Sequence, residues 1–370
     1  MPNRFLCFNN KSYLALVMCT KPRLRKFMDT NSNRLIMKNK AFYLLLCLCL
    51  SACSKSLHTE ASQNPLRIYD EFWQHLDENY IFFEEKQVDW EAVYQQYQGQ
   101  LSERSSDEEL LEVMENSLLE LRDAHNRIRT PFRVAKRFDY TEGFDIHFSP
   151  QVVEASYIDG IFSKEGSFRY GLIDASTVYI YVPKMESIYR LRSLIRSLIH
   201  PQIKHLILDV RNNGGGDSNP VPELVGDFVQ QRRLLGSYLE KSGPNRQDET
   251  APLPVYALPS VDHYFDVNVV LLINRACYSA TSSLAGMCQG LDNFTLIGQV
   301  TGGGAGGNAG FELSNGWEIA ISVSDFIDKA GNSIEMGVRP DIEVVNRESN
   351  LSSGKDVMLE RALQFLAEKG

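Results

Sequence analysis

The sequence predicts an α/β protein in which a small N-terminal helical bundle precedes a mainly parallel sheet with helices on both faces. Two observations predict it. Apolar residues recur at three- and four-residue spacing up to about residue 122, and between residues 176 and 300 short runs rich in Val, Ile and Leu alternate with helical patterns. A chain of 370 residues, 43% of them hydrophobic, is long enough for one large core and a small subdomain.

The helical bundle is predicted over residues 66–125. Its first helix has one apolar face, which consists of Tyr69, Phe72, Trp73, Leu76 and Tyr80. Further along, Ser106 and Glu109 have the spacing of a capping box in front of a second apolar run. The remaining residues, 126–370, are predicted to form the α/β core.

Four apolar runs are predicted as the main strands of this core: 176–185, 203–210, 267–274 and 294–300. The helical patterns between them cover 186–200, 220–233 and 280–290. Strands joined through helices favour parallel pairing, and sites in such sheets lie beyond the carboxyl ends of the strands. The segments "DVRNNGGG" and "LINRACYSA" both follow a predicted strand in this way.

The two ends of the chain differ in charge. Residues 1–52 carry nine Lys or Arg and one Asp, which leaves 29 basic and 46 acidic residues, a net charge of −17, for the rest. An acidic body repels phosphate backbones, so the composition argues against a nucleic-acid partner.

An export signal is predicted to start at Met37. Lys38 and Lys40 precede an apolar run over residues 41–50, which is too short to span a bilayer as a stable helix. The run ends in Leu-Ser-Ala-Cys, with the cysteine at Cys53. This resembles the lipobox of bacterial lipoproteins, in which the cysteine is diacylated and becomes the first residue. A short transmembrane anchor with an incidental cysteine is the alternative.

These features predict the organisation of the N-terminal part. Residues 1–52 are expected to be a signal or lead region, with the true start at Met37, and residues 53–65 a lipidated tether. The protein is then expected in the bacterial cell envelope, anchored to a membrane and facing the periplasm or the cell surface.

Only Cys277 and Cys288 of the seven cysteines fall in the predicted folded body. An exported compartment permits a disulfide between them, although burial as free thiols is the commoner outcome. The sequence has no Cys/His spacing typical of zinc, and no cofactor or metal is expected.

Ser279 is the candidate nucleophile. It lies between a predicted buried strand and a helical run of small residues, where a hydroxyl gains from nearby backbone N–H groups. A serine at such a turn also commonly caps the helix, and both readings remain open at this point.

Several segments together resemble a known family. "LRDAHN", "LILDVRNNGGG", "SATS", "GQVTGGGAGG" and "IEMGVRPDIEVV" occur in the order and approximate spacing of the tail-specific, or C-terminal processing, serine peptidases and their tricorn-core relatives. The resemblance covers about residues 66–368. It implies a crotonase-like or ClpP-like core and an endopeptidase that acts on proteins or peptides without a cofactor.

The resemblance also implies the catalytic residues. In one branch a lysine is the general base, and its position here is occupied by Gly304. The tricorn-like branch uses an upstream histidine and a glutamate, which are matched by His125 and Glu335. A triad of Ser279, His125 and Glu335 follows, and an imidazole with an ordinary pKa of about 6.5 suits proton transfer near neutrality. The alternatives are a structural histidine paired with Asp123 and a solvated turn acid at Glu335.

The glycines at 214–216 either make a tight turn or expose N–H groups to a developing oxyanion. On the second reading Gly215 and Gly216 form one half of an oxyanion hole and the amide of Ala280 forms the other. A side chain at Gly215 would crowd the substrate carbonyl.

Two departures from the family pattern are visible. Many relatives carry a glutamate where this chain has Ser282, and the stretch between His125 and residue 176 is too short for a PDZ domain. A non-catalytic ligand- or peptide-binding lipoprotein on the same fold is the main alternative, and a hydrolase of non-peptide esters is a third. The joint presence of serine, histidine and glutamate favours an enzyme.

Overall fold

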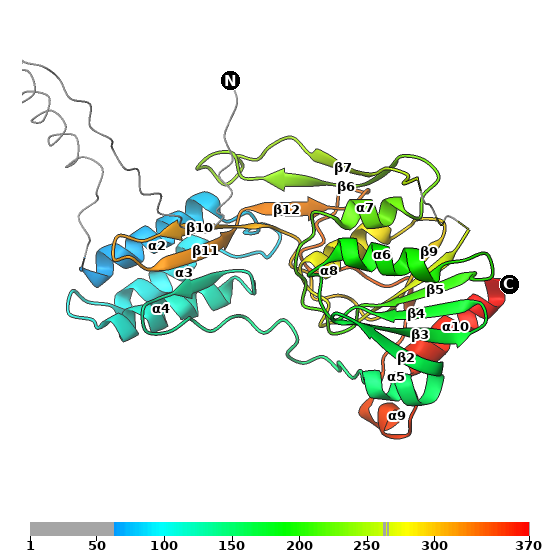
Figure 1. Cartoon of the computed structure of the whole chain (residues 1–370). Helices are drawn as coiled ribbons and strands as arrows, with labels where there is room; N and C mark the ends of the chain where they lie inside the picture. Colours follow the sequence, from blue (N-terminus) through cyan, green and yellow to red (C-terminus); the bar gives the residue numbers. More distant parts are fainter. Residues whose placement is uncertain (1–62, 262–263, 265, 370) are drawn as a thin grey trace, which may run out of the picture. The chain divides into compact units, whose positions relative to one another are not determined.

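The central sheet is built from strands whose side chains alternate between two buried faces. In the computed structural model, which describes residues 63–261, 264 and 266–369, its strand order is β13-β9-β8-β5-β4-β3-β2 (Figure 1). Neighbours from β13 to β4 pair in parallel, whereas β4, β3 and β2 pair antiparallel. The bounds are β2 Asp159–Glu165, β3 Phe168–Asp174, β4 Thr177–Tyr181, β5 His205–Asp209, β8 Asn268–Ile273, β9 Phe294–Gly298 and β13 Ile342–Glu343. The predicted mainly parallel sheet is confirmed.

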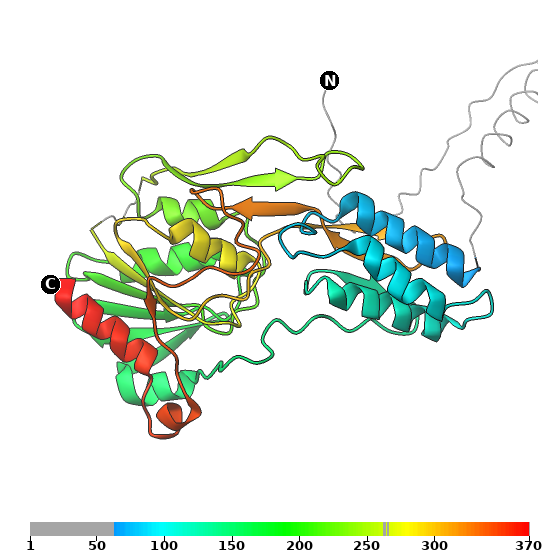
Figure 2. The same ribbon diagram turned by 180° about the vertical axis from the view of Figure 1, so that it is seen from behind.

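Helices cover both faces of this sheet, as Figures 1 and 2 show. One face packs against α6 (Ile188–Leu198), α7 (Val221–Gly226) and α8 (Ala280–Cys288), and the other against α5 (Pro150–Tyr157) and α10 (Val357–Lys369). Period-two alternation explains the division, because Leu206 and Leu208 enter the first core while Ile207 enters the second. The short helix α9 spans Glu348–Ser352.

The helical pattern predicted over residues 220–233 is wrong in its second half. Helix α7 ends at Gly226, and strand β6 begins at Arg233. A Cβ at Gly226 would lie 2.3 Å from the Leu258 carbonyl oxygen, and Asp227 is held by the Arg192 guanidinium at 2.7 Å. Tertiary contacts therefore end the helix where the apolar pattern alone would continue it.

The N-terminal bundle takes two of its strands from the C-terminal half. Its elements are α2 Pro65–Asn79, α3 Trp90–Tyr97, the 3₁₀ turn η2 Gln98–Gln100, α4 Asp107–Glu120 and a sheet of β1 Arg127–Arg129, β11 Glu318–Ser322 and β10 Asn308–Glu312. The expected capping box of α4 is present, with Ser106 N–H donating to Glu109 Oε2 at 2.7 Å. Trp317 and Ile319 share one buried cluster with Phe72 and Leu110, so residues 66–125 do not form this core alone.

A third sheet, β12-β6-β7, lies beside the helices α7 and α8 (Figure 1). Its strands are β6 Arg233–Glu240, β7 Leu253–Ala257 and β12 Ser324–Ile327, all antiparallel. In its register Ser324 lies opposite Glu240.

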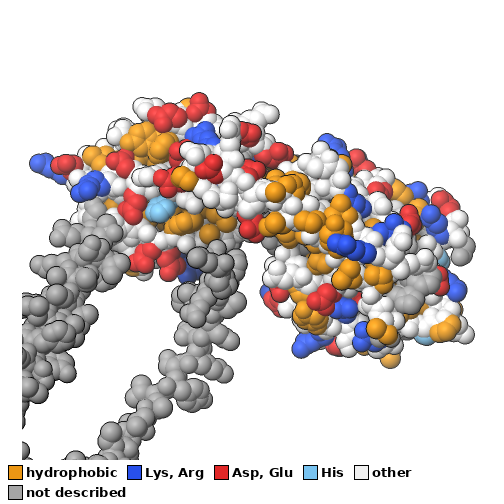
Figure 3. Space-filling view, turned by 90° about the horizontal axis from the view of Figure 1, so that it is seen from above, with side chains coloured by type: hydrophobic (Ala, Val, Ile, Leu, Met, Phe, Trp, Pro, Cys, Tyr) orange, Lys and Arg blue, Asp and Glu red, His pale blue; other side chains and the backbone are white. Residues whose placement is uncertain are grey.

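The predicted signal region, Cys53 and nearly all of the tether lie outside the described residues. Among the helices that are described, none is both long and apolar enough to cross a membrane. Cys277 and Cys288 are buried free thiols and form no disulfide. Figure 3 shows acidic and basic side chains interspersed over one face of the molecule.

Candidate active site

Ser279 occupies a strained turn at the carboxyl end of β8. Its backbone has φ 57° and ψ −126°, a conformation that costs a residue with a Cβ of order 1–3 kcal/mol and that clusters at functional sites. Ser279 stands at the N-cap position of α8, yet its side chain makes no capping hydrogen bond. The capping interpretation therefore does not account for this serine.

Two glycine-rich loops hold this turn in place. Tyr278 N–H donates to the Asn213 carbonyl at 3.1 Å, and Ser279 N–H donates to the Gly303 carbonyl at 2.9 Å. The first of these loops is anchored by the fully buried Arg211, whose guanidinium lies 2.8 Å from the Asp356 carboxylate and also pairs with Asp209. The strained nucleophile turn is thus held by hydrogen bonds to loops, one of which is anchored by buried ion pairs.

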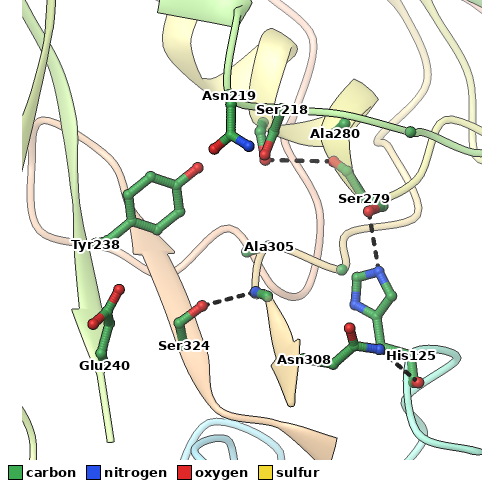
Figure 4. A pocket seen from close by; sticks show the side chains of 15 residues that line it. His125, Ser218, Asn219, Tyr238, Glu240, Ser279, Ala280, Ala305, Asn308 and Ser324 are labelled. Carbon is green, nitrogen blue, oxygen red and sulfur yellow. Dashed lines mark hydrogen bonds between the residues drawn. The ribbon is translucent and has the colours of Figure 1, made fainter. Parts of the chain in front are cut away.

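His125 lies directly against Ser279. Its Nε2 is 3.0 Å from Ser279 Oγ, the dashed contact in Figure 4. Asp123 Oδ1 accepts the His125 backbone N–H at 2.8 Å, and the imidazole packs on the Tyr278 ring with centroids 4.9 Å apart. The turn between α4 and β1 therefore brings together two residues that are 154 positions apart in the sequence.

Burial lowers the pKa of the His125 imidazole below its usual value, since desolvation disfavours the charged form. The Asp123 carboxylate opposes this change, whereas the charges of Lys86, Arg137 and Arg127 add to it. The imidazole is therefore neutral at neutral pH, the state in which Nε2 can accept a proton from the serine.

We expect the pH dependence of kcat/KM to reflect this environment. Hydrolysis should rise with pH through one ionisation below about 6.5 and then stay level, because only the neutral imidazole is a base. This places the inflection lower than an unperturbed histidine would. The measurement is kcat/KM of a peptide substrate between pH 4.5 and 9. An inflection above pH 8 would indicate a lysine-like base instead.

Glu335 is not brought to His125. Its Oε1 lies 2.6 Å from Lys86 Nζ, and its Oε2 accepts the Ala305 N–H at 2.9 Å. His125 Nδ1 is buried without a hydrogen-bond partner among the described residues. The prediction that Glu335 orients the imidazole by a direct contact is not met, because the buried ammonium of Lys86 takes that carboxylate.

Glu335 instead supports the loop at 303–305. Burial and the neighbouring Asp123 carboxylate raise its pKa, against the opposing effect of the Lys86 ammonium. Its backbone carbonyl also accepts the Gly304 N–H at 3.2 Å. Both ends of this residue thus hold a loop that lines the pocket.

The glycine loop offers one free backbone amide to the candidate oxyanion hole, and this amide is not that of Gly215. Gly215 N–H donates to Asn213 Oδ1 at 2.9 Å and is therefore occupied. The Gly215 carbonyl and the Asp217 N–H both bond to Met185, so the Gly216 N–H points to the opposite side. Gly216 and Ala280 line the pocket beside Ser279. The candidate oxyanion hole is corrected to these two amides.

Gly215 has a packing role instead. Its φ is +104°, and a Cβ there would lie 2.7 Å from the Tyr278 carbonyl oxygen and 2.8 Å from Ser279 Cβ.

We expect Gly215→Ala to lower kcat by about 10²-fold or more. The added methyl group would displace the nucleophile turn and with it the Ala280 amide, and the loss of one oxyanion donor lowers the rate by about that much. Steady-state kinetics with a peptide substrate measure this. The control is Gly316→Ala, at a positive-φ turn with open space around its Cβ position, which should change stability but not kcat. Equal rates for both variants would contradict the assigned contact.

The absence of a lysine at position 304 has a steric reason in this chain. A Cβ on Gly304 would lie 2.4 Å from the Tyr278 ring, and φ is +72°. Tyr278 also stacks on Tyr140 with centroids 4.1 Å apart, so it cannot readily yield. Ser282, in place of the family glutamate, is buried and donates to Thr301 Oγ1 at 2.9 Å.

Ser279 and His125 open onto a cavity of about 400 Å³ (Figure 4). Within the part of the chain that is described, no group of three His, Cys, Asp or Glu side chains could hold a metal ion. Sequence reasoning missed Lys86, Asn213 and Tyr278 as supports of this site. The position of Asn213 directly before the three glycines could have indicated its role. Nothing in the sequence connects Lys86 with Glu335.

Comparison with known proteins shows similarity in sequence and in fold. The model of peptidase family S41 matches residues 176–344, and the model of the tricorn protease C1 domain matches residues 62–118. A carboxyl-terminal-processing protease of Synechocystis sp. is 28% identical over 165 residues, 43% of this chain and 36% of that protein. The chain thus spans little more than a third of the length of this curated relative.

Two solved structures extend the comparison. A Parabacteroides merdae protein, provisionally classed as a peptidase, has a TM-score of 0.77 at 29% identity over 84% of this chain and 98% of its own. A lipoprotein from Streptococcus agalactiae shares the fold, with a TM-score of 0.53 at 16% identity over 84% of this chain and 98% of its own. Fold and site together have the arrangement of serine hydrolases. Residues 176–344 form a domain of the tail-specific peptidase family S41.

Proposed function

We propose that this protein is a serine endopeptidase that cleaves peptide bonds in protein or peptide substrates. The observation that carries the proposal is the 3.0 Å contact between Ser279 Oγ and His125 Nε2 at a strained turn beside an open pocket. A protein that only binds a ligand has no use for a strained serine paired with a neutral imidazole.

The geometry supports the following chemistry. Ser279 Oγ attacks the substrate carbonyl carbon while His125 Nε2 takes the hydroxyl proton, and the N–H groups of Gly216 and Ala280 stabilise the oxyanion. The C–N bond then breaks as the imidazolium returns its proton to the leaving amine. A water molecule, deprotonated by the same imidazole, hydrolyses the acyl-enzyme and restores Ser279.

Labelling with a serine-directed fluorophosphonate tests this proposal. We expect the label to map to Ser279 and to be lost in His125→Ala, because the reagent needs an activated hydroxyl. Label on another serine, or on none, would favour the alternative of a binding lipoprotein. Parallel assays with a peptide and with a simple ester of the same acyl group distinguish a peptidase from an esterase.

We further propose that the protein is a lipoprotein of the bacterial cell envelope, with Cys53 as the diacylated first residue. The support is the basic pair, the apolar run and the Leu-Ser-Ala-Cys sequence in that order. A protein described as a lipoprotein, from Streptococcus agalactiae, has the same fold.

Cys53→Ser should therefore leave an unprocessed precursor or release the protein from membranes. Membrane fractionation with metabolic fatty-acid labelling measures both. The control is Cys288→Ser, which removes a buried thiol of the core and should leave labelling intact. Normal labelling and fractionation of Cys53→Ser would overturn the assignment.

A further inference from the structure

The wall of the pocket opposite Ser279 and His125 is formed by strand β6. Tyr238 and Glu240 stand on this wall in Figure 4, with the catalytic pair on the other side. Residues two apart in a strand face the same way, so both side chains are directed to one face of β6. Ser324 is the cross-strand neighbour of Glu240 in β12 and lines the same pocket.

Glu240 brings an uncompensated negative charge to this wall. The residue is solvent-exposed, and its carboxylate forms no ion pair or hydrogen bond with any part of the chain that the structure describes. The hydroxyl of Ser324, its neighbour, already accepts the Gly307 N–H at 2.8 Å. The strand therefore presents a carboxylate whose partner is not supplied by the protein.

The rest of the pocket does not neutralise this charge. Its lining contains no Lys or Arg, and the positive form of His125 is disfavoured by burial. The other polar side chains, among them Ser218, Asn219 and Asn308, are uncharged. The pocket thus has a negative character on the side away from the nucleophile.

We propose that Glu240 selects substrates with a positive charge close to the scissile bond, namely an ammonium or guanidinium group of the bound peptide. This rests on the proposed peptidase function and names its substrate class. A cation would form a charge-assisted contact with Glu240 while its apolar stem lies along the Tyr238 ring. The free carboxylate of a chain end would be repelled from the same wall.

Quenched fluorescent peptides that differ at one position test the proposal. A neutral parent peptide, acetylated and amidated at its ends, carries Lys, norleucine or Glu in turn at each position from four before to four after the scissile bond. We expect Lys at one position to raise kcat/KM about five- to tenfold over norleucine, and Glu to lower it, in keeping with a partly exposed ion pair. A parent with a free N-terminus shows whether a terminal ammonium can replace the side chain.

Variants of Glu240 assign the effect. Glu240→Gln should bring the ratio of Lys to norleucine substrates to about one, and Glu240→Lys should invert it. The matched control is Glu249→Gln, on the same β hairpin but outside the pocket lining, which should keep the wild-type ratio. A ratio that is unchanged in Glu240→Gln, or that falls equally in Glu249→Gln, would overturn the proposal.

A binding measurement separates this inference from the function on which it rests. In Ser279→Ala, fluorescence anisotropy should show the Lys peptide bound about five- to tenfold more tightly than the norleucine peptide, and Glu240→Gln in this background should remove the difference. Absence of hydrolysis with this preference intact would contradict only the peptidase function. Hydrolysis without any preference for a cation would contradict only the role of Glu240.

Discussion

Ser279→Ala and His125→Ala should each lower kcat for peptide hydrolysis by about 10⁴- to 10⁶-fold, and the double variant should be little slower than either. The reason is that the 3.0 Å Oγ to Nε2 contact makes the two side chains one unit, in which neither acts without the other. Residual hydrolysis above the rate in water would come from the Gly216 and Ala280 amides and from substrate binding. Steady-state kinetics with one fluorescent peptide measure all three variants.

Two matched controls accompany these variants. Ser282→Ala removes a hydroxyl three residues away that donates to Thr301 and does not line the pocket, and His147→Ala removes an imidazole beside Asp145, away from the pocket lining. Both should keep kcat within a few-fold of wild type. A wild-type rate in His125→Ala would show that the base lies elsewhere, and strictly multiplicative effects in the double variant would show that the two residues act independently.

The sheet could be predicted because its buried strands carry their signal locally. Runs such as "LILDV" are apolar on both faces, which is what a parallel strand between two helical layers requires. The prediction of a helix over residues 220–233 was wrong in its second half, because the helix end depends on contacts with the Leu258 carbonyl and Arg192. Both lie in segments that are distant in the sequence. The strands β10 and β11, which complete the N-terminal core, were missed for the same reason.

The candidate site divides along the same line. Ser279 and His125 were named from motifs, and the structure places them in contact. Glu335 was assigned to the imidazole because a motif gives the residue but not its partner, and the actual partner, Lys86, lies in a segment without a motif. The Gly215 amide was assigned to the oxyanion hole because the acceptor Oδ1 of Asn213 depends on a side-chain conformation that composition does not encode.

The ion pair between Lys86 and Glu335 connects the N-terminal segment to the loop beside the nucleophile. The two side chains are 3% and 1% exposed, and Lys86 Nζ also donates to the Arg122 carbonyl at 2.9 Å. Removing one member of such a pair leaves a buried charge without compensation, which typically costs about 3–5 kcal/mol. We therefore expect Lys86→Met to lower the free energy of unfolding by about that amount.

The pH dependence of this loss has a definite sign. Without the ammonium, burial and Asp123 both act to raise the pKa of Glu335, so its folded-state pKa lies above the unfolded value of about 4.3. Stability contributed by a group with a raised pKa is present below the unfolded pKa and is lost as pH rises through the folded one. The deficit of Lys86→Met relative to wild type should therefore be larger at pH 8.5 than at pH 5.5.

Urea unfolding at both pH values measures this prediction, together with a double-mutant cycle. Lys86→Met/Glu335→Gln should recover at least about 1 kcal/mol of the loss, because the glutamine leaves no buried charge and its carbonyl can still accept the Ala305 N–H. Lys136→Met, at a side chain that is 83% exposed and 4.0 Å from Glu115, is the control and should change stability by no more than about 0.5 kcal/mol. A deficit that is the same at both pH values, or a double variant as unstable as Lys86→Met, would mean that lost packing of the lysine stem, and not the unpaired carboxylate, causes the effect.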